Sequence, residues 1–510
     1  MRIKNAFRNS FFSIISQMIL IVVGFFSQRV MNLRLGEELV GMNSVISNIN
    51  AIISISELGM STAIVFHLYS AFADGDEARI ASLMKMYKRA YCIIATVMIS
   101  LGLCVLPFVH LFLRENSFSL EYIRLIYSLW LVRSALSCLL SYKRSILIAD
   151  QKEYVVSIAA LLANVMNYSL IIVLVQLFEN YALALALNIV VEACMNLWIS
   201  SYVNRKYLFL KRYKGEAVEK EVVSKVFKDI KNIFVSRLST NLLVSTDNLI
   251  MSSFISVGIV GLYSNYSMIV QSVTNILEAC SNALQPTVGN LFTEKNHEKE
   301  YGVLRQITFM FFWGTSFATV SMLVLITPFV TDIWLGTEYA LNVEIVVCCI
   351  INFFTRLISM PIAMMMGVTG LFKKERNLSI IVAVVNLIVS LLLVFKLGVI
   401  GVLLGTFASY VIQIIFRIKF LIQEYLEQKC SKYIIELLQY SIVTIVEVFI
   451  AVLLKSYLYQ EGSLVSFVML MFICIIVPNG INCMLFRKSW RFQSVFGMIK
   501  SLLLTNKRGD

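Results

Sequence analysis

The chain has 510 residues, of which 58% are hydrophobic and only 15% charged, and its mean hydropathy is +0.79. A water-soluble globular protein of this length does not have such a composition, so the sequence predicts an integral membrane protein. The formal net charge of +13 is attributed to membrane topology and to contact with anionic lipid rather than to nucleic-acid binding.

Apolar runs of roughly twenty residues predict an all-α fold with about fourteen transmembrane helices. The first six are expected at 9–32, 39–66, 90–113, 121–148, 154–178 and 181–203, the next six at 229–255, 258–285, 304–330, 341–366, 378–396 and 399–421, and the last two at 433–456 and 464–486. The first run is too long for a signal peptide and is interpreted as a retained helix.

Positive charge differs between the two sets of loops. The loops after the even-numbered predicted helices are basic, and the most basic one, "NRKYLFLKRYKGEAVEKEVVSKVFKDIK", follows the sixth helix. Loops on the other side, such as "FENYA" and "WLGTEYA", carry hardly any Lys or Arg. The positive-inside rule therefore predicts that both termini are cytoplasmic. The short outer loops and the lack of a cleavable signal are those expected in a bacterial cytoplasmic membrane.

Cysteines and histidines give no indication of a metal or redox site. The ten cysteines lack ligand-like spacing, and His67, His110 and His297 do not cluster. The sequence also lacks the GxxxxGK[ST] motif of ATP-binding proteins. We therefore expect no cofactor and no enzymatic activity, and a driving force from an H⁺ or Na⁺ gradient, the membrane potential or consumption of product outside.

An internal repeat appears when the chain is aligned with itself at an offset of about 220 residues. Val40-Gly41 then falls on Val260-Gly261, and Ser44 falls on Ser264. The repeat predicts two six-helix lobes in parallel orientation, residues 1–215 and 216–425, followed by a helix pair and tail at 426–510.

Polar residues follow one face of each of four predicted helices, at 100° per residue. They include Gln17 and Gln28 in the first helix; Asn43, Asn50 and Glu57 in the second; Arg237, Asn241 and Asn248 in the seventh; and Tyr263, Gln271 and Glu278 in the eighth. Since these helices are related by the repeat, we expect the faces to line a shared water-accessible cavity. The alternative is interhelical hydrogen bonding inside each lobe.

Three acidic residues are candidates for gating or ion coupling. Asp247 stands inside the apolar segment "STDNLIMSSF", and its repeat-related position is close to Arg29. We expect the two to pair across the seam between the lobes as a gate, with a structural pair inside one lobe as the alternative. Glu57 and Glu278 could couple transport to an ion, or simply be solvated at helix ends.

Four arginines are candidates for binding an anionic substrate, because guanidinium groups bind phosphate oxygens in a bidentate manner. Arg133 and Arg356 occupy nearly matching positions in the two repeats, and Arg29 and Arg237 lie on the polar faces. Arg133 and Arg356 could instead extend to the membrane surface or pair with a neighbour such as Glu344.

Several segments together resemble a known family. "LGEELVGMNSV", "SELGM", "ADQKEY", "STDNLIMSSFISVGIVGLYSNYSMI" and "QPTVGNLF" are similar to Wzx-type polysaccharide flippases of the multidrug/oligosaccharidyl-lipid/polysaccharide (MOP) exporter superfamily, over about residues 5 to 425. The resemblance implies two lobes around a central cavity and an undecaprenyl-diphosphate-linked oligosaccharide as substrate. It also implies that cavity cations contact the diphosphate, and Arg29 and Arg237 are the positions that fit. Further partners implied are the polymerase and glycosyltransferases of the same pathway.

Three alternatives remain at this stage. A drug or cation antiporter of the same superfamily would share the architecture, although a cationic cavity disfavours it. A membrane polysaccharide polymerase or ligase would need catalytic groups on a large outer loop, and the outer loops are short. A non-transporting scaffold would tolerate neutralisation of every cavity arginine.

Overall fold

The computed structural model of the protein describes residues 2–54, 65, 68–213, 245–291, 296–495 and 497. Regular structure in these ranges is helical, without strands. Eleven helices in the described ranges are long and apolar enough to cross a membrane. The prediction of an all-α, multi-pass membrane fold is thereby confirmed, whereas the total of about fourteen helices stays a prediction because most of the predicted helix 229–255 lies outside the described residues.

The helices before residue 261 begin with one long element. They are α1 (Arg2–Ile53), α3 (Glu77–Val105), η1 (Leu106–Phe112), α4 (Leu120–Ser141), α5 (Arg144–Ala149), α6 (Glu153–Phe178), α7 (Tyr181–Lys206) and α8 (Phe209–Arg212), with a further helix over 245–254 and the first residues of α10 (Val257–Leu291). The bounds agree with prediction where charged or turn residues interrupt an apolar run, as at both ends of α6.

The later helices follow α10. They are α11 (His297–Pro328), η3 (Phe329–Trp334), η4 (Thr337–Tyr339), α12 (Val343–Ile358), α13 (Met360–Val368), α14 (Phe372–Leu397), α15 (Val399–Ile418), η5 (Lys419–Gln423), α16 (Cys430–Leu458) and α17 (Leu464–Phe486). Two of them, η3 and η5, are π-helical continuations of longer helices. Hydropathy does not predict such continuations, because an apolar run is the same in either backbone conformation.

The predicted helix 9–32 and the first part of the predicted helix 39–66 join in α1, while most of residues 55–66 lie outside the described residues. The helix is interrupted at Gly36, whose backbone has φ 80° and ψ 168°. A residue without a Cβ adopts this conformation at little steric cost. The predicted connection between the two helices is therefore a single-residue break.

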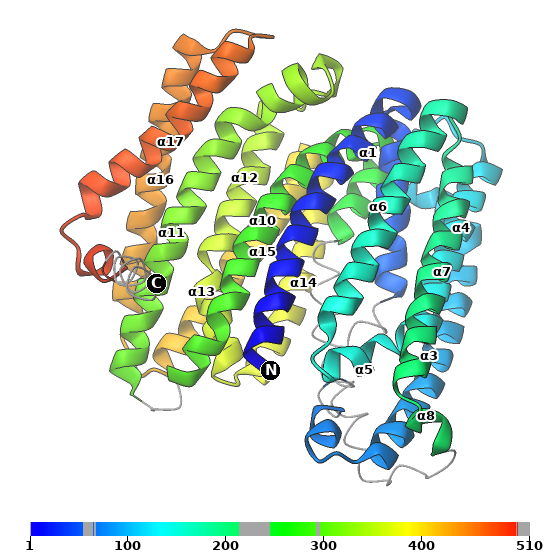
Figure 1. The fold of residues 1–510 in the computed structure, drawn as a ribbon. Helices are drawn as coiled ribbons and strands as arrows, with labels where there is room; N and C mark the ends of the chain where they lie inside the picture. Colours follow the sequence, from blue (N-terminus) through cyan, green and yellow to red (C-terminus); the bar gives the residue numbers. More distant parts are fainter. Residues whose placement is uncertain are drawn as a thin grey trace. The chain divides into compact units, whose positions relative to one another are not determined.

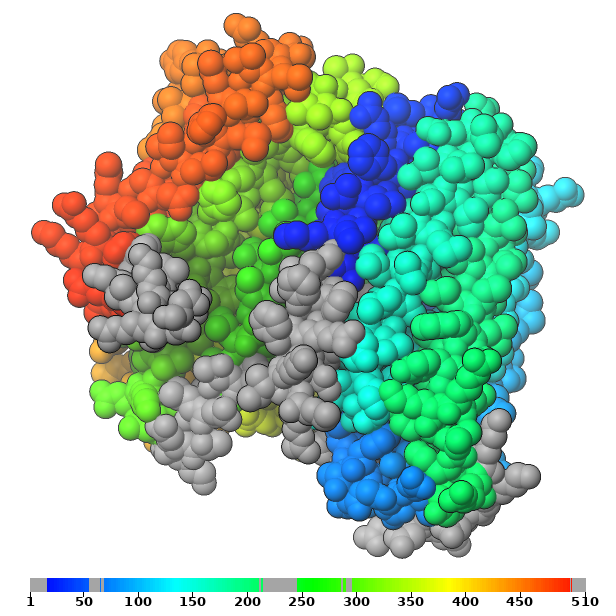
Figure 2. Space-filling model, in the orientation of Figure 1, coloured from blue at the N-terminus to red at the C-terminus, as the bar shows by residue number. Residues whose placement is uncertain are grey.

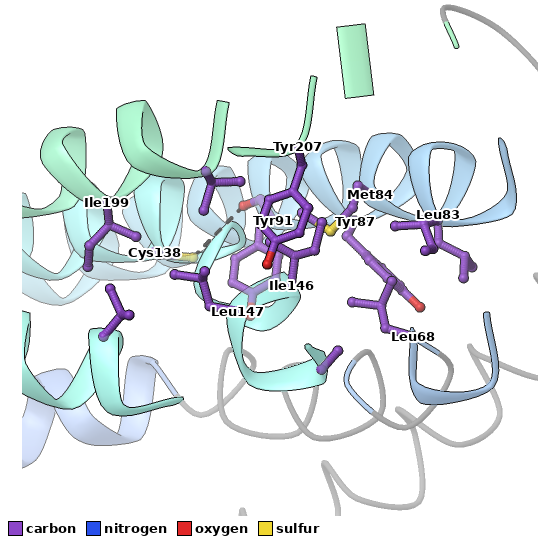
Figure 3. Packing of buried hydrophobic residues seen from close by; sticks show 14 of the residues in the cluster. Leu68, Leu83, Met84, Tyr87, Tyr91, Cys138, Ile146, Leu147, Ile199 and Tyr207 are labelled. Carbon is purple, nitrogen blue, oxygen red and sulfur yellow. Dashed lines mark hydrogen bonds between the residues drawn. The ribbon is translucent and has the colours of Figure 1, made fainter. Parts of the chain in front are cut away.

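Packing divides the chain into two compact units, Met1–Gly261 and Leu262–Asp510. These bounds differ from the repeat bounds at 215 and 425, because the repeat follows sequence similarity and the units follow contacts. In the first unit a buried cluster joins α3, α4, α5 and α7 (Figure 3). There the Cys138 thiol of α4 donates to the Tyr91 carbonyl of α3 at 3.9 Å, and Ile146 and Leu147 of α5 fill the space beside them.

Two glycines that the repeat aligns contact each other's helix within the first unit. A Cβ on Gly41 of α1 would lie 2.1 Å from the carbonyl oxygen of Val257, at the start of α10. Conversely, a Cβ on Gly261 would lie 1.9 Å from the carbonyl oxygen of Glu37. Each glycine thus packs on the residue four positions before the other glycine. Backbones approach this closely in membrane helices only where side chains are absent.

In the second unit, α16 and α17 pack beside α11 (Figure 1). Figure 2 shows α17 and residues 487–495, in orange and red, on the surface of this unit. Large apolar side chains such as Phe449 and Ile476 are exposed on the pair, at 68% and 65%. An apolar exposed surface of this kind faces lipid in a membrane protein.

Candidate functional site

The α10 helix carries a polar face that is open to the surroundings. Gln271, Asn275, Glu278, Asn282 and Gln285 fall within about 80° of arc on an ideal helix. Gln271, Asn282 and Gln285 are exposed and the other two are half-buried. Gln271 donates through Nε2 to the Asn275 side chain at 2.7 Å. These side chains form a hydrogen-bonding strip along one side of the helix.

Two hydroxyl residues beside this strip are buried, although they count as polar in the sequence. Thr274 and Ser281 are 2% and 7% exposed, and the Thr274 hydroxyl donates to the Val270 carbonyl at 2.8 Å. Small hydroxyl side chains satisfy themselves on their own helix and therefore do not require water. Half-buried Asn275 and exposed Asn282, which the sequence analysis missed, complete the strip. A polar face defined by Asn and Gln side chains, rather than by Ser and Thr, would have included Asn275 and Asn282.

Polarity also separates α10 from the other long helices. With 35 residues it is long enough to span a membrane. It is nevertheless too polar to join the eleven described helices that qualify by length and apolar character. A helix of this kind is expected beside protein or water rather than surrounded by lipid.

Two residues predicted separately, Arg356 and Glu278, form an ion pair. Arg356 of α12 donates through one guanidinium nitrogen to Oε1 of Glu278 at 2.5 Å. Both side chains are 33% exposed, so the pair lies at the edge of the α10 polar face. The partner considered for Arg356 from the sequence was Glu344, and the structure pairs Arg356 with Glu278 instead. Glu344 is out of reach because it lies in the first turn of α12 and Arg356 in the last, about 18 Å apart along the axis at 1.5 Å per residue.

In the first unit, Arg133 of α4 is held by a partner that the sequence analysis missed. Its Nε and one terminal nitrogen donate to the two oxygens of Glu192 in α7, both at 2.9 Å. The guanidinium also lies over the ring of Trp130, 4.9 Å from its centroid. Glu192 is the one acidic residue in the predicted helix 181–203. That isolation was the available signal, since a lone acid in an apolar helix needs a cation.

Asn43 joins three helices of the same unit. Its Oδ1 accepts hydrogen bonds from the Trp130 indole of α4 at 3.0 Å and from the Tyr181 hydroxyl of α7 at 2.5 Å. Asn50, one of the buried polar residues, donates to the Ile46 carbonyl at 3.0 Å. Asn43 thus makes interhelical hydrogen bonds of the kind named above as the alternative to a cavity role, whereas the bond from Asn50 to Ile46 stays within α1. The cavity roles of both residues stay predictions.

The remaining predicted residues lie on α1, on the helix over 245–254 and on α10. Gln17 and Arg29 are exposed, Gln28, Asn248 and Tyr263 are half-buried, and Asp247 is buried. Arg237, Asn241 and Glu57 lie outside the described residues. The pairing of Asp247 with Arg29 and the roles of these residues stay predictions. Among described residues no group of three or more His, Cys, Asp or Glu side chains is arranged to hold a metal ion.

Comparison with known proteins places the chain. It matches the family of polysaccharide biosynthesis proteins over residues 4–292. No curated protein matches it. Among solved structures, the lipid II flippase MurJ in an inward closed conformation has a TM-score of 0.71 at 15% identity, with 93% of this chain and 98% of that one covered.

Two transporters of the MOP superfamily are similar in fold as well. An inward-facing multidrug resistance MATE family transporter has a TM-score of 0.66 at 14% identity, covering 80% of this chain and 97% of that one. A MOP superfamily transporter from Pyrococcus furiosus has a TM-score of 0.57 at 14% identity, covering 84% and 97%. At these identities the likeness establishes the fold alone. Since the family match spans more than half of the chain, the protein belongs to the polysaccharide biosynthesis protein family and has the fold of flippases and transporters of the MOP superfamily.

Proposed function

We propose that the protein is a flippase that carries undecaprenyl-diphosphate-linked oligosaccharide units from the inner to the outer leaflet of a bacterial cytoplasmic membrane. The units would serve a cell-surface polysaccharide such as a capsule or an exopolysaccharide, and both termini would be cytoplasmic. Membership of the polysaccharide biosynthesis family supports this proposal, and so does a fold found in flippases and transporters rather than in enzymes.

The exposed polar face of α10 is the observation that carries the proposal. Amide groups such as those of Gln271, Asn275 and Asn282 bind sugar hydroxyls through hydrogen bonds, and a purely lipid-facing helix has no use for them. In the proposed mechanism a polar interior that includes this face opens alternately to the two sides of the membrane. The sugars and diphosphate occupy that interior while the polyprenyl chain stays in lipid.

Arginines provide the proposed diphosphate contacts. Arg29 and Arg237 are the first candidates, because the resemblance to the flippase family points to their positions. Arg133 and Arg356 are second candidates, since each already binds a carboxylate, Glu192 or Glu278. An H⁺ or Na⁺ gradient would supply the energy, with Asp247, Glu57 and Glu278 as candidate coupling or gating groups.

Leaflet accessibility of a labelled undecaprenyl-diphosphate oligosaccharide in proteoliposomes tests the proposal. The wild type should expose the inner-leaflet sugar, and Arg29→Ala and Arg237→Ala should slow this by about tenfold or more, because each removes a charge-assisted contact. Arg205→Ala is the matched control, since Arg205 is exposed in the last turn of α7. Loss of transport in the control as well would contradict the site assignment.

A drug or cation antiporter is the second candidate function, favoured by the fold shared with the MATE family transporter. The same proteoliposomes would then transport a lipophilic cation in exchange for an ion that moves the other way, down its imposed gradient. If the cation moves and no lipid-linked oligosaccharide does, the flippase proposal is wrong and the antiporter takes its place.

A further inference from the structure

Polar contacts at both ends attach the C-terminal helix pair to α11. Near the start of α16, Glu436 accepts hydrogen bonds from Arg305 of α11 at 2.8 Å and from Arg491, which follows α17, at 3.0 Å. Near the end of α16, Lys455 donates to the Val324 carbonyl of α11 at 2.8 Å. Tyr459 then donates to Asp332 at 2.6 Å. Both ends of the contact are thus held by charged groups with partners.

Glu447 lies between these two ends in a different environment. It stands in the middle of α16, its exposed fraction is 0%, and the Ser316 hydroxyl of α11 donates to its Oε2. Its Oε1 is buried and has no hydrogen-bond partner. One turn further along each helix, Val320 and Ala451 belong to an apolar cluster. The buried hydroxyls about one turn away, those of Thr444 in α16 and Thr319 in α11, donate to carbonyls of their own helices. The Ser316 hydroxyl is therefore the one hydrogen-bond donor found for the carboxyl group in the described residues.

In the described helices around Glu447, no cation lies near enough to pair with it. Residues 306–331 of α11 and its continuation, and all of α17, contain no Lys, Arg, His, Asp or Glu. On α16 itself, Glu436 and Lys455 lie about 16 Å and about 12 Å away along the axis, at 1.5 Å per residue. The other titratable side chains facing this region are Tyr440 of α16 and Cys474 of α17.

An ionised carboxylate is far more costly to bury than a neutral carboxylic acid, because burial removes the hydration that stabilises the charge. Here a single hydroxyl would have to replace that hydration. We propose that Glu447 is a proton-binding site: it holds a proton as a neutral carboxylic acid inside the membrane at neutral pH and in that form joins α16 to α11. The ligand is H⁺, and loss of this proton weakens the attachment of the helix pair.

Infrared difference spectroscopy of the full-length protein in lipid tests the proton directly. The spectrum of wild type minus Glu447→Gln at neutral pH should contain the C=O stretch of a carboxylic acid, shifted in D₂O. Glu375→Gln is the matched control, because Glu375 forms an ion pair with Arg417 and is 25% exposed. Its difference spectrum should contain carboxylate bands instead. Carboxylate bands without an acid band for Glu447 overturn the proposal.

Two further measurements keep the test decisive. Ser316→Ala removes the hydrogen bond, so the acid band should remain and move to higher frequency; its conversion to carboxylate bands would contradict a neutral acid. Raising the pH from mildly acidic to alkaline values should lower the melting temperature of the wild type more than that of Glu447→Gln, because the folded wild type holds a proton on Glu447 that the unfolded chain releases at lower pH. Parallel curves would remove the proposed link between the proton and helix attachment. Neither result depends on which substrate is transported.

Discussion

Arg133 and Arg356 stand at nearly matching positions of the two repeats, yet each binds an acid from a different helix. Arg133 takes Glu192 of α7, and Arg356 takes Glu278 of α10. Sequence reasoning placed both arginines in the membrane but missed the first pairing and chose another partner for the second. Hydropathy locates a charge along a helix, whereas its partner depends on helix rotation and packing, which a single sequence does not reveal.

Breaking the Arg133 pair should destabilise the first unit. Arg133→Ala leaves Glu192 without its cation, and we expect the free energy of unfolding to fall by about 2 kcal/mol. Breaking a fully buried pair costs about 3–5 kcal/mol. The loss is smaller because the two side chains are 21% and 25% exposed. Melting temperatures in detergent provide the measurement. The double variant Arg133→Met, Glu192→Leu should recover part of the loss, and a double variant less stable than Arg133→Ala would contradict this account.

Tyr207 predicts a pH effect at the end of α7. Its hydroxyl donates to Oδ2 of Asp150 at 2.6 Å, and burial followed by this hydrogen bond raises its pKa above the ordinary 10.0. The folded state therefore holds this proton more tightly, so the tyrosine's stabilisation is complete below pH 10.0 and is lost as pH rises further. Tyr207→Phe should lower the free energy of unfolding at neutral pH by about 1.5–3 kcal/mol, because it removes a hydrogen bond to a charged acceptor. The melting temperature should fall accordingly.

The same variant should show a weaker decline at strongly alkaline pH, because no phenol remains to ionise. Melting temperature as a function of pH, with Tyr213→Phe as the control for a partly exposed phenol, measures both effects. If the melting temperatures of wild type and Tyr207→Phe fall equally steeply with alkaline pH, ionisation of Tyr207 does not cause the decline.

At the scale of elements, apolar runs bounded by charged loops predicted most helices within a few residues. The length of an apolar run predicts where a membrane helix lies. It does not predict the backbone conformation inside the run, such as the π-helical segments η3 and η5. It also does not predict which side of α10 is exposed, since Thr274 and Gln271 both count as polar residues and only Gln271 is accessible.

The contact of Gly41 and Gly261 should be intolerant of a single methyl group. In Gly41→Ala or Gly261→Ala the new Cβ would meet a backbone carbonyl at 2.1 or 1.9 Å, so the helices must separate. We expect the free energy of unfolding to fall by about 1–3 kcal/mol, as it does when a side chain is enlarged in a well-packed core. Gly302→Ala in α11 is the control, because nothing lies within 4 Å of its Cβ position.

There the alanine should stabilise α11 by about 0.5–1 kcal/mol, since glycine is a poor helix residue. Melting temperatures of the three variants decide the matter. Equal behaviour of Gly41→Ala and Gly302→Ala would show that the close approach has no energetic weight.

At the scale of the whole molecule, composition and apolar runs were enough to predict the membrane class and the helical architecture, and the resemblance of a few segments to known flippases predicted the family. The candidate site was less predictable. The sequence pointed to arginines, whereas the clearest structural feature is the strip of amide side chains on α10, which became visible only when exposure separated Asn275 and Asn282 from Thr274 and Ser281.

Removing the C-terminal helix pair tests how the second unit is completed. A chain ending at residue 425 would leave Arg305 and Asp332 of the α11 region without Glu436 and Tyr459. Because an unpaired arginine beside lipid is costly, we expect little of this chain to accumulate in membranes. Co-expression of residues 426–510 as a separate polypeptide should restore it. Normal accumulation of the truncated chain alone would show that the pair is a dispensable attachment.

The reciprocal glycine contact also bears on ancestry. Gly41 packs on Val257 and Gly261 on Glu37, so residue i meets residue j of the other copy and j meets i. That is the pattern of an isologous interface in a two-fold symmetric dimer. If one ancestral gene encoded a single copy, a mutation at its one glycine codon would have altered the contact twice. Under the same premise, duplication and fusion would make the two codons independent, so that each side of the contact would drift while the other kept the helices together.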